Sequence, residues 1–283
     1  MSRYADGLTW GEGPRVHDGS LWVSDPQGGV IWTDSGGGWH SLPLQSQSNG
    51  LWFLPDGRLV GAIMRERRVG LWTGSDFGEY ADLSGLVTGP LGDMIGDERG
   101  GLYVDDVGYA AHLGEDPKPG RLVYVDPRGA ARVAADGIEF PNGLALIDAG
   151  RTLVVAETWV QRLTAFTVGP DGVLTDQRLY ADLAALVHPE ARPDGICAGP
   201  SGVWVCTLTA QSVVLVDADG VQTSIGTGDG YPIACCLDGE SRLLVTVAES
   251  GGIPVMEAVA NKTVRTHVEA FDLPVAKQEA HER

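Results

Sequence analysis

The stretch RPDGICAGPSGVWVCTL, residues 192–208, contains a Pro-Asp-Gly tripeptide, a second glycine-containing turn and a short apolar run. Proline presets φ and glycine permits a positive φ, so Pro-Asp-Gly predicts a turn. The run GVWVCTL is rich in the residue types that favour a buried strand. In isolation, Asp194 would only cap the turn. Its place relative to the rest of the chain suggests more.

The second half of this stretch is one copy of a repeat in which a glycine-containing turn precedes alternating apolar residues. The six copies are HDGSLWVSD from His17, PDGRLVGAI from Pro55, ERGGLYVDD from Glu98, DAGRTLVVAET from Asp148, GPSGVWVCTL from Gly199 and DGESRLLVTVA from Asp238. Their starts are about 40 to 50 residues apart, which is the spacing of propeller blades.

Further strand candidates lie between the copies, and helical periodicity is nearly absent. They include GVIWTDSG from Gly29, RLVYVDPRG from Arg121 and SVVLVDADG from Ser212. We therefore predict an all-β fold, a six-bladed β-propeller with four-stranded blades, in which residues 1–283 form a single domain. A two-sheet sandwich is the alternative, which six spaced repeats disfavour. The polar end FDLPVAKQEAHER, from Phe271, predicts a mobile tail.

Composition limits the partners. The chain has 283 residues, 43% of them hydrophobic, and a formal net charge of −18. This charge would repel nucleic acid and anionic membranes, so we expect neither as a partner. No long apolar run predicts a transmembrane helix, and MSRYADGLTWGEGP lacks a signal-peptide pattern, so we expect a cytoplasmic protein. Four cysteines without a C-x-x-C pair indicate buried thiols rather than a zinc site. The oligomeric state is left open.

The repeat also predicts where polar side chains meet. In a propeller the innermost strand of each blade starts near one mouth of the channel, so residues at an equivalent offset surround one axis. About nine to eleven positions before the first apolar residue of each copy stand Glu12, Asn49, Gly92 with Asp93, Asn142, Asp194 and Ala234. Five of the six blades thus offer a carboxylate or amide oxygen.

Such a ring of oxygen donors suits Ca²⁺, Mg²⁺ or Mn²⁺ better than softer metals. An ion with open coordination positions can polarise a substrate carbonyl or lower the pKa of a bound water. A carboxylate beside it can then act as general base or nucleophile. The structural alternative is that these residues only satisfy turn amides where the strands start.

Four stretches carry a resemblance to a known family: GEGPRV, GDMIGDERGGLYV, EFPNGLALIDAGRTLVVAET and RPDGICAGPSGVWV. In this order and spacing, from about Leu8 to Val247, the chain resembles the family of gluconolactonase, regucalcin (senescence marker protein) and luciferin-regenerating enzyme. The resemblance implies a six-bladed, calcium-dependent propeller whose best-known activity is lactone hydrolysis.

The resemblance also implies roles for three residues of the ring. Glu12 in GEGP matches a metal-binding glutamate, and Asn142 in PNG matches a metal-binding asparagine. Asp194 in PDG matches the aspartate that binds metal and is the usual candidate for general base. Because the repeat selects the same three positions independently, we predict Glu12, Asn142 and Asp194 as metal ligands and Asp194 as catalytic.

The chain departs from the family pattern nearby. Gly92 stands where many members have asparagine, Pro90 where regucalcin-like sequences have arginine, and Asp106 where related bacterial sequences often show asparagine. These departures weaken the prediction of a polyhydroxylated, gluconate-type substrate. Asn49, Asp93 or a water are the candidates to fill the vacated coordination position.

Five residues are predicted to contact substrate. They are Asn49, Asp93, Asp106, Tyr109 and Trp159, of which the two aromatics are expected to form a lid or wall unless they only pack the blades.

We therefore predict a metal-dependent hydrolase of a small molecule, a calcium-dependent lactonase, with Mg²⁺, Mn²⁺ or Zn²⁺ as alternative ions. Asp194 would activate the attacking water or attack the carbonyl directly. One alternative is a metal-dependent esterase or phosphotriesterase on the same scaffold. The other is a calcium- or ligand-binding propeller without turnover, because fold does not determine function.

Overall fold

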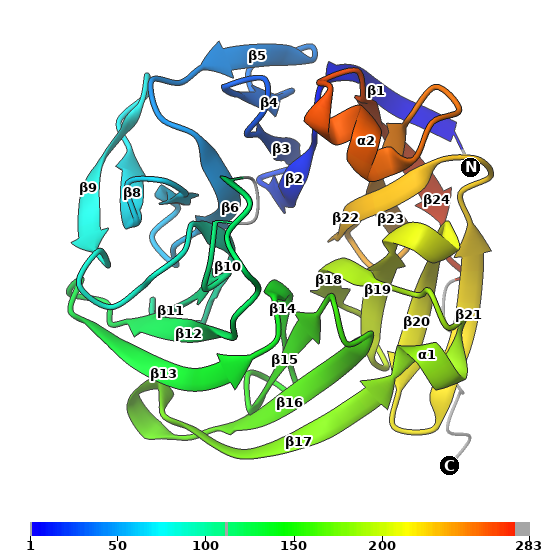
Figure 1. The fold of residues 1–283 in the computed structure, drawn as a ribbon. Helices are drawn as coiled ribbons and strands as arrows, with labels where there is room; N and C mark the ends of the chain where they lie inside the picture. Colours follow the sequence, from blue (N-terminus) through cyan, green and yellow to red (C-terminus); the bar gives the residue numbers. More distant parts are fainter. Residues whose placement is uncertain (1, 111–112, 275–283) are drawn as a thin grey trace, which may run out of the picture.

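Six four-stranded antiparallel sheets are arranged around a common centre in the computed structural model, which describes residues 2–110 and 113–274 (Figure 1). This architecture confirms the predicted all-β, six-bladed propeller with four-stranded blades. In the first five blades the strands lie side by side in chain order, with the first strand innermost.

The blades have the following strands. Blade 1 contains β2 (Glu12–His17), β3 (Ser20–Asp25), β4 (Val30–Thr33) and β5 (His40–Pro43). Blade 2 contains β6 (Ser48–Phe53), β7 (Leu59–Ile63), β8 (Arg68–Trp72) and β9 (Phe77–Asp82). Blade 3 contains β10 (Leu91–Gly96), β11 (Leu102–Asp106), β12 (Gly120–Val125) and β13 (Ala131–Ile138). Blade 4 contains β14 (Pro141–Ile147), β15 (Thr152–Glu157), β16 (Arg162–Val168) and β17 (Leu174–Asp182). Blade 5 contains β18 (Pro193–Ala198), β19 (Val203–Thr207), β20 (Ser212–Asp217) and β21 (Gly220–Gly226). Blade 6 contains β22 (Tyr231–Asp238), β23 (Arg242–Glu249), β24 (Arg265–Asp272) and β1 (Ser2–Leu8).

The sixth blade closes the ring by joining both ends of the chain. Its outermost strand is β1, which pairs antiparallel with β24 (Figure 1). Phe271 is buried and lies in β24, so the beginning of the expected C-terminal tail belongs to the sheet. Residues 275–283, which make up most of that expected tail, lie outside the described residues.

Helices are few and short. The helices that lie wholly within the described residues are α1 (Leu183–Leu186), α2 (Val255–Ala260) and the 3-10 turns η2 (Pro170–Gly172) and η3 (Leu208–Ala210). Among the described residues, no helix has the length and apolar character needed to cross a membrane.

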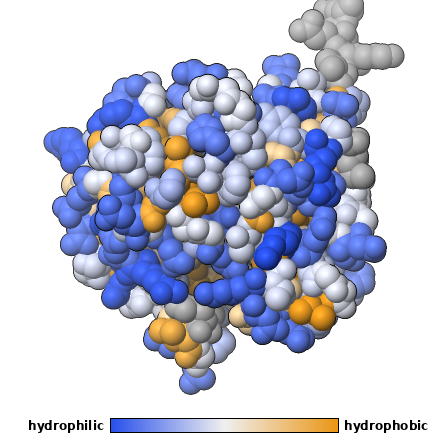
Figure 2. Space-filling view, turned by 90° about the horizontal axis from the view of Figure 1, so that it is seen from above, coloured by the Kyte–Doolittle hydropathy of each residue, from blue (hydrophilic) through white to orange (hydrophobic). Residues whose placement is uncertain are grey.

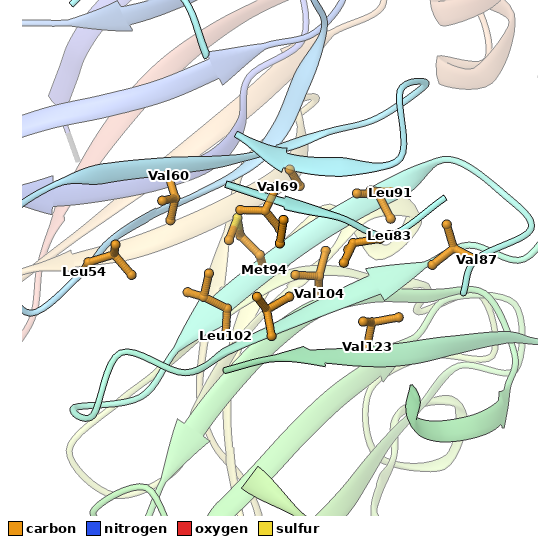
Figure 3. Close-up of a cluster of buried hydrophobic side chains, with 13 residues drawn as sticks. Leu54, Val60, Val69, Leu83, Val87, Leu91, Met94, Leu102, Val104 and Val123 are labelled. Atoms are coloured by element: carbon orange, nitrogen blue, oxygen red, sulfur yellow. The ribbon is translucent and has the colours of Figure 1, made fainter. Parts of the chain in front are cut away.

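The hydrophobic core is divided among the interfaces between neighbouring blades. Figure 3 shows the interface of blades 2 and 3, where Val60 and Val69 pack with Met94 and Val104. Similar clusters lie between the other blades. On the face seen in Figure 2, hydrophobic residues occur in small separate areas among hydrophilic ones. The alternating apolar residues of the repeat therefore pack one blade against the next.

Every one of the first five innermost strands bulges at the same point. In β18, Pro193 pairs with Thr207 and Ile196 pairs with Val205, so three steps on one strand oppose two on the other. The strands β2, β6, β10 and β14 have the same offset. Bulges redirect side chains and often lie beside active sites. Here they lie at the ring positions predicted from the repeat.

The prediction that Pro193-Asp194-Gly195 forms a turn was wrong. Residues 193–195 begin the strand β18, and Gly195 does not have a positive φ. Instead, a Cβ at position 195 would lie 2.5 Å from the Cβ of Ala234 in the next blade. Gly143, in the PNG stretch, would bring a Cβ to 2.4 Å from the backbone nitrogen of Ile196. Glycine is needed here because neighbouring innermost strands approach closely.

Candidate functional site

A cavity of about 290 Å³ lies over the starts of the innermost strands. Its floor is formed by residues of five of these strands: Glu12, Asn49, Leu91, Gly92, Pro141, Asn142 and Asp194. Its walls come from the connections between the second and third strands of blades 2 to 6, which contribute Met64, Val107, Tyr109, Thr158, Trp159, Leu208, Thr209, Met256 and Val259. The helix α2 thus covers the side where blade 6 has no polar ring residue.

Glu12, Asn142 and Asp194 meet at the floor of this cavity, as predicted. The side-chain amide of Asn142 donates a hydrogen bond to Oδ1 of Asp194 at 2.6 Å. The indole of Trp10 donates to Oε1 of Glu12 at 2.7 Å. Thr158 supports Asn142, since its hydroxyl lies 3.3 Å from the amide nitrogen and donates to the carbonyl of Pro193. These bonds fix the three side chains that come from blades 1, 4 and 5.

The two floor carboxylates are buried together and repel each other. Burial, reinforced by the charge of Asp194, raises the pKa of Glu12 well above its usual range. Burial also raises the pKa of Asp194 to about 7, although the hydrogen bond from Asn142 acts in the opposite direction. No arginine or lysine forms an ion pair with either carboxylate within the described part of the chain. A cation at this floor would offset the unfavourable charge.

Of the three other polar or acidic residues that were predicted to contact substrate, one lines the cavity and two do not. Asn49 lines the cavity floor. Asp93 does not line it, because its carboxylate turns away and pairs with the guanidinium of Arg15 at 3.1 Å. Asp106 does not line it either: it is fully buried and accepts hydrogen bonds from the backbone amides of Thr88, Gly89 and Gly108. Asp106 thus holds together the loops that flank β10 and β11.

Asp105 fills the space that Gly92 leaves. Its carboxylate accepts hydrogen bonds from the backbone amides of Gly92, at 2.7 Å, and Asp93, at 2.9 Å. A Cβ at position 92 would lie only 2.4 Å from Oδ1 of Asp105. Burial raises the pKa of Asp105 well above its usual range, and the charge of Asp93 adds to this. Because Asp105 lines the cavity, it adds a third acidic residue to the floor.

The two predicted aromatic residues form a wall of the cavity. The indole of Trp159 donates a hydrogen bond to the hydroxyl of Tyr109 at 2.8 Å. Phe140 packs between them, with its ring centroid 5.9 Å from that of Tyr109 and 4.8 Å from that of Trp159. The wall therefore offers an apolar surface on which the indole N–H of Trp159 is already paired.

Sequence reasoning missed Trp10, Thr158, Asp105 and Arg192 as residues of this site. Arg192 lies two positions before Asp194, and Trp10 two positions before Glu12, so nearness in sequence was an available signal for both. Thr158 and Asp105 follow or end second strands rather than innermost ones, and the repeat offset does not select those positions.

The donor set fits a hard divalent cation. It offers two carboxylates and the amide oxygen of Asn142, which are ligands of the kind that Ca²⁺ takes. Such an ion would neutralise the two buried carboxylates, which have no basic partner in the part of the chain that the structure describes. Glu12, Asn142 and Asp194 are therefore the residues that would hold it.

Comparisons with known proteins identify the family and the fold. The family model described as SMP-30/Gluconolactonase/LRE-like region matches residues 10–249. The structure is similar to that of a luciferin-regenerating enzyme, with TM-score 0.79 and 17% identity over 96% of this chain and 93% of that one. It is also similar to a calcium-binding protein, regucalcin, from Agrobacterium tumefaciens, with TM-score 0.77 and 19% identity over 94% and 91% of the two chains. A gluconolactonase from Xanthomonas campestris gives TM-score 0.72 and 23% identity over 94% and 88%. No curated protein matches the sequence.

Proposed function

The chain belongs to the SMP-30/Gluconolactonase/LRE-like family, and from this premise we propose that it is a metal-dependent hydrolase that opens a small lactone. The observation that carries the proposal is the floor of the cavity. There Glu12 and Asp194 are buried side by side with Asn142, without a basic partner among the described residues, beneath an apolar wall.

A divalent cation, Ca²⁺ in the first instance, would supply positive charge to the lactone carbonyl oxygen and to the negative charge that develops on it. Glu12, Asn142 and Asp194 would hold this ion. Two acidic side chains and one amide leave room for further ligands, since Ca²⁺ takes six to eight oxygens. Mg²⁺, Mn²⁺ and Zn²⁺ are the other ions to compare.

Asp194 is the proposed catalytic carboxylate. As a general base it accepts a proton from water while the water oxygen bonds to the carbonyl carbon. The ring carbon–oxygen bond then breaks, and the proton passes to the leaving oxygen to give a hydroxy acid. Direct attack by Asp194 on the carbonyl would give the same product through an acyl intermediate. The hydrogen bond from Asn142 orients the carboxylate for either route.

Proton release from sugar, aliphatic and aromatic lactones, measured with Ca²⁺ and with excess chelator, tests the proposal. Turnover that the chelator abolishes and Asp194→Ala eliminates is the expected result. Turnover of esters or phosphotriesters but of no lactone would assign the chain to that other hydrolase class. If folded protein turns over none of these compounds with any of the ions, the proposal is overturned in favour of a binding protein.

A further inference from the structure

One basic side chain, that of Arg192, lines the described part of the cavity among acidic and apolar side chains. Of the described residues that line it, Arg192 alone is basic, whereas Glu12, Asp105 and Asp194 are acidic and most others are apolar. Arg192 lies immediately before β18, at the wall that Trp159 forms. Arg192 therefore brings positive charge to one wall, apart from the acidic floor at which the cation is proposed to bind.

The main chain holds Arg192 in place. Its amide donates to the carbonyl of Glu190 at 2.8 Å, and its own carbonyl accepts from the amide of Leu208 at 2.9 Å. The hydroxyl of Thr209 also bonds to the carbonyl of Glu190. The guanidinium lies over the ring of Trp159, 5.1 Å from its centroid. Stacking of this kind positions the guanidinium plane while it leaves the N–H groups at the edge free.

The N–H groups of this guanidinium have no hydrogen-bond partner within residues 2–110 and 113–274, and its Nε is buried without one. The carboxylate that forms an ion pair with Arg192 is that of Glu190, whose Oε2 lies 4.0 Å from a guanidinium nitrogen, beyond hydrogen-bond distance. The Glu190 side chain is 65% exposed. By contrast, Arg162 bonds to both oxygens of Glu157, at 2.8 and 3.0 Å. An arginine that keeps its donors free beside a cavity is suited to bind a carboxylate through two parallel bonds.

We propose that Arg192 is a specificity-determining residue that binds a carboxylate group carried by the lactone substrate. This inference rests on the proposed lactonase function and adds the substrate class: a lactone with an apolar ring and a carboxylate substituent. Arg192 attracts that substituent, so the substrate enters with its carboxylate toward Trp159 and its lactone carbonyl toward the floor, where the proposed cation would lie. The aromatic wall of Tyr109, Phe140 and Trp159 packs against the ring.

Paired substrates test the inference. Dihydrocoumarin carrying a carboxylate is compared with the same ring carrying a carboxamide, in the calcium-loaded protein and in Arg192→Gln. We expect the wild type to have a lower KM for the carboxylate-bearing lactone than for the carboxamide. Arg192→Gln should raise the KM for the carboxylate-bearing lactone by about 10- to 100-fold, with kcat nearly unchanged. The carboxamide should be hydrolysed by both proteins with similar KM. Arg192→Lys should fall between them, because an ammonium cannot form the bidentate pair.

Arg128→Gln is the matched control, since Arg128 is 90% exposed and the variant changes the net charge equally. It should leave both KM values unchanged. Glu190→Gln should lower the KM of the carboxylate, because it removes the competing charge. The inference would be overturned if the wild type had equal KM values for the carboxylate-bearing and carboxamide-bearing lactones. It would also be overturned if Arg192→Gln changed the two KM values equally.

The two proposals fail in different ways. If no lactone is turned over, the lactonase proposal fails, and calorimetric binding of the carboxylate-bearing compound still tests Arg192. Tighter binding to the wild type than to Arg192→Gln would support the role of Arg192, and equal binding would refute it. A melting temperature measured for each variant separates lost binding from lost folding.

Discussion

Asp194 combines two opposed demands on one residue. Its carboxylate must be ionised to bind a cation or accept a proton, yet burial raises its pKa to about 7. Without a cation, the folded protein therefore holds a charge that the unfolded chain would keep in water at no such cost. The proposed function at this position would therefore be gained at the expense of stability, a trade-off that is common at active sites.

Replacing Asp194 by Asn should separate the two demands. Asp194→Asn should lower lactone turnover by about 10²- to 10⁴-fold, the range of general acid–base catalysis. In chelator, the same variant should melt at a higher temperature than the wild type above pH 7, because it removes the buried charge. Proton-release assays and thermal unfolding measure the two effects, and a lower melting temperature for the variant would contradict the argument.

The pH dependence of unfolding should have a definite sign in chelator. The pKa of Asp194 rises from 3.8 to about 7 on folding, so the folded state binds the proton more tightly. The free energy of unfolding should then fall as pH rises from about 4 to about 7, by about 4 kcal/mol for this group. Urea unfolding across this range measures the slope. It should be smaller in Asp194→Asn, and identical slopes in the two proteins would refute the assignment.

Gly92 is a second residue whose role is set by a single contact. Gly92→Ala would place a Cβ 2.4 Å from the carboxylate of Asp105. We expect the substitution to lower the free energy of unfolding by about 1 to 3 kcal/mol through overpacking. Gly85→Ala is the control, because a Cβ there meets no atom within 4 Å. Urea unfolding compares the two, and equal stability would show that Asp105 moves aside freely.

Bulges and strand closure are the features that matter at the scale of elements. Short apolar runs after glycine-containing turns were sufficient to predict the second strand of each blade, because these strands are buried on both faces between neighbouring blades. The bulges were not predictable, since no residue of β18 requires an extra step against β19. They lie beside close contacts between neighbouring innermost strands, such as those of Gly143 and Gly195, and the sequence of a single blade does not show these contacts.

The strand β1 should contribute a large share of stability despite its edge position. Leu8 at its end is fully buried in the interface of blades 6 and 1. Leu8→Ala should therefore lower the free energy of unfolding by about 2 to 5 kcal/mol. Leu179→Ala in β17 should change it by less than about 0.5 kcal/mol, because that side chain is 62% exposed. Urea unfolding gives both values, and similar losses would argue against tight closure.

At the scale of the whole molecule, the spacing of the repeat predicted the ring of blades and predicted that Glu12, Asn142 and Asp194 lie close together. It did not select Arg192, Asp105 or Thr158, which depend on connections whose course is set by tertiary packing. The arginine expected from the resemblance is absent at Pro90, which lines the cavity, while Arg192 of another blade lines the same cavity. Sequence thus predicted the floor of the cavity better than its walls.

Cation binding should stabilise the whole propeller, because its proposed ligands come from blades 1, 4 and 5. At a Ca²⁺ concentration one hundred times its Kd, the free energy of unfolding should rise by about 2.7 kcal/mol. Thermal unfolding with Ca²⁺ and with chelator measures this gain. Glu12→Gln should lose most of it, whereas the exposed Glu240→Gln should keep it. An unchanged response in Glu12→Gln would remove Glu12 from the ligand set.

The pairing of β1 with β24 also determines when the ring can close during translation. The strand Ser2–Leu8 is translated before the other described strands, whereas its partner Arg265–Asp272 is translated after them. Five blades can assemble while translation continues, with the first strand waiting unpaired. The ring closes only after β24 has been translated. A chain released early therefore carries an open sheet edge, which invites aggregation and marks it for degradation.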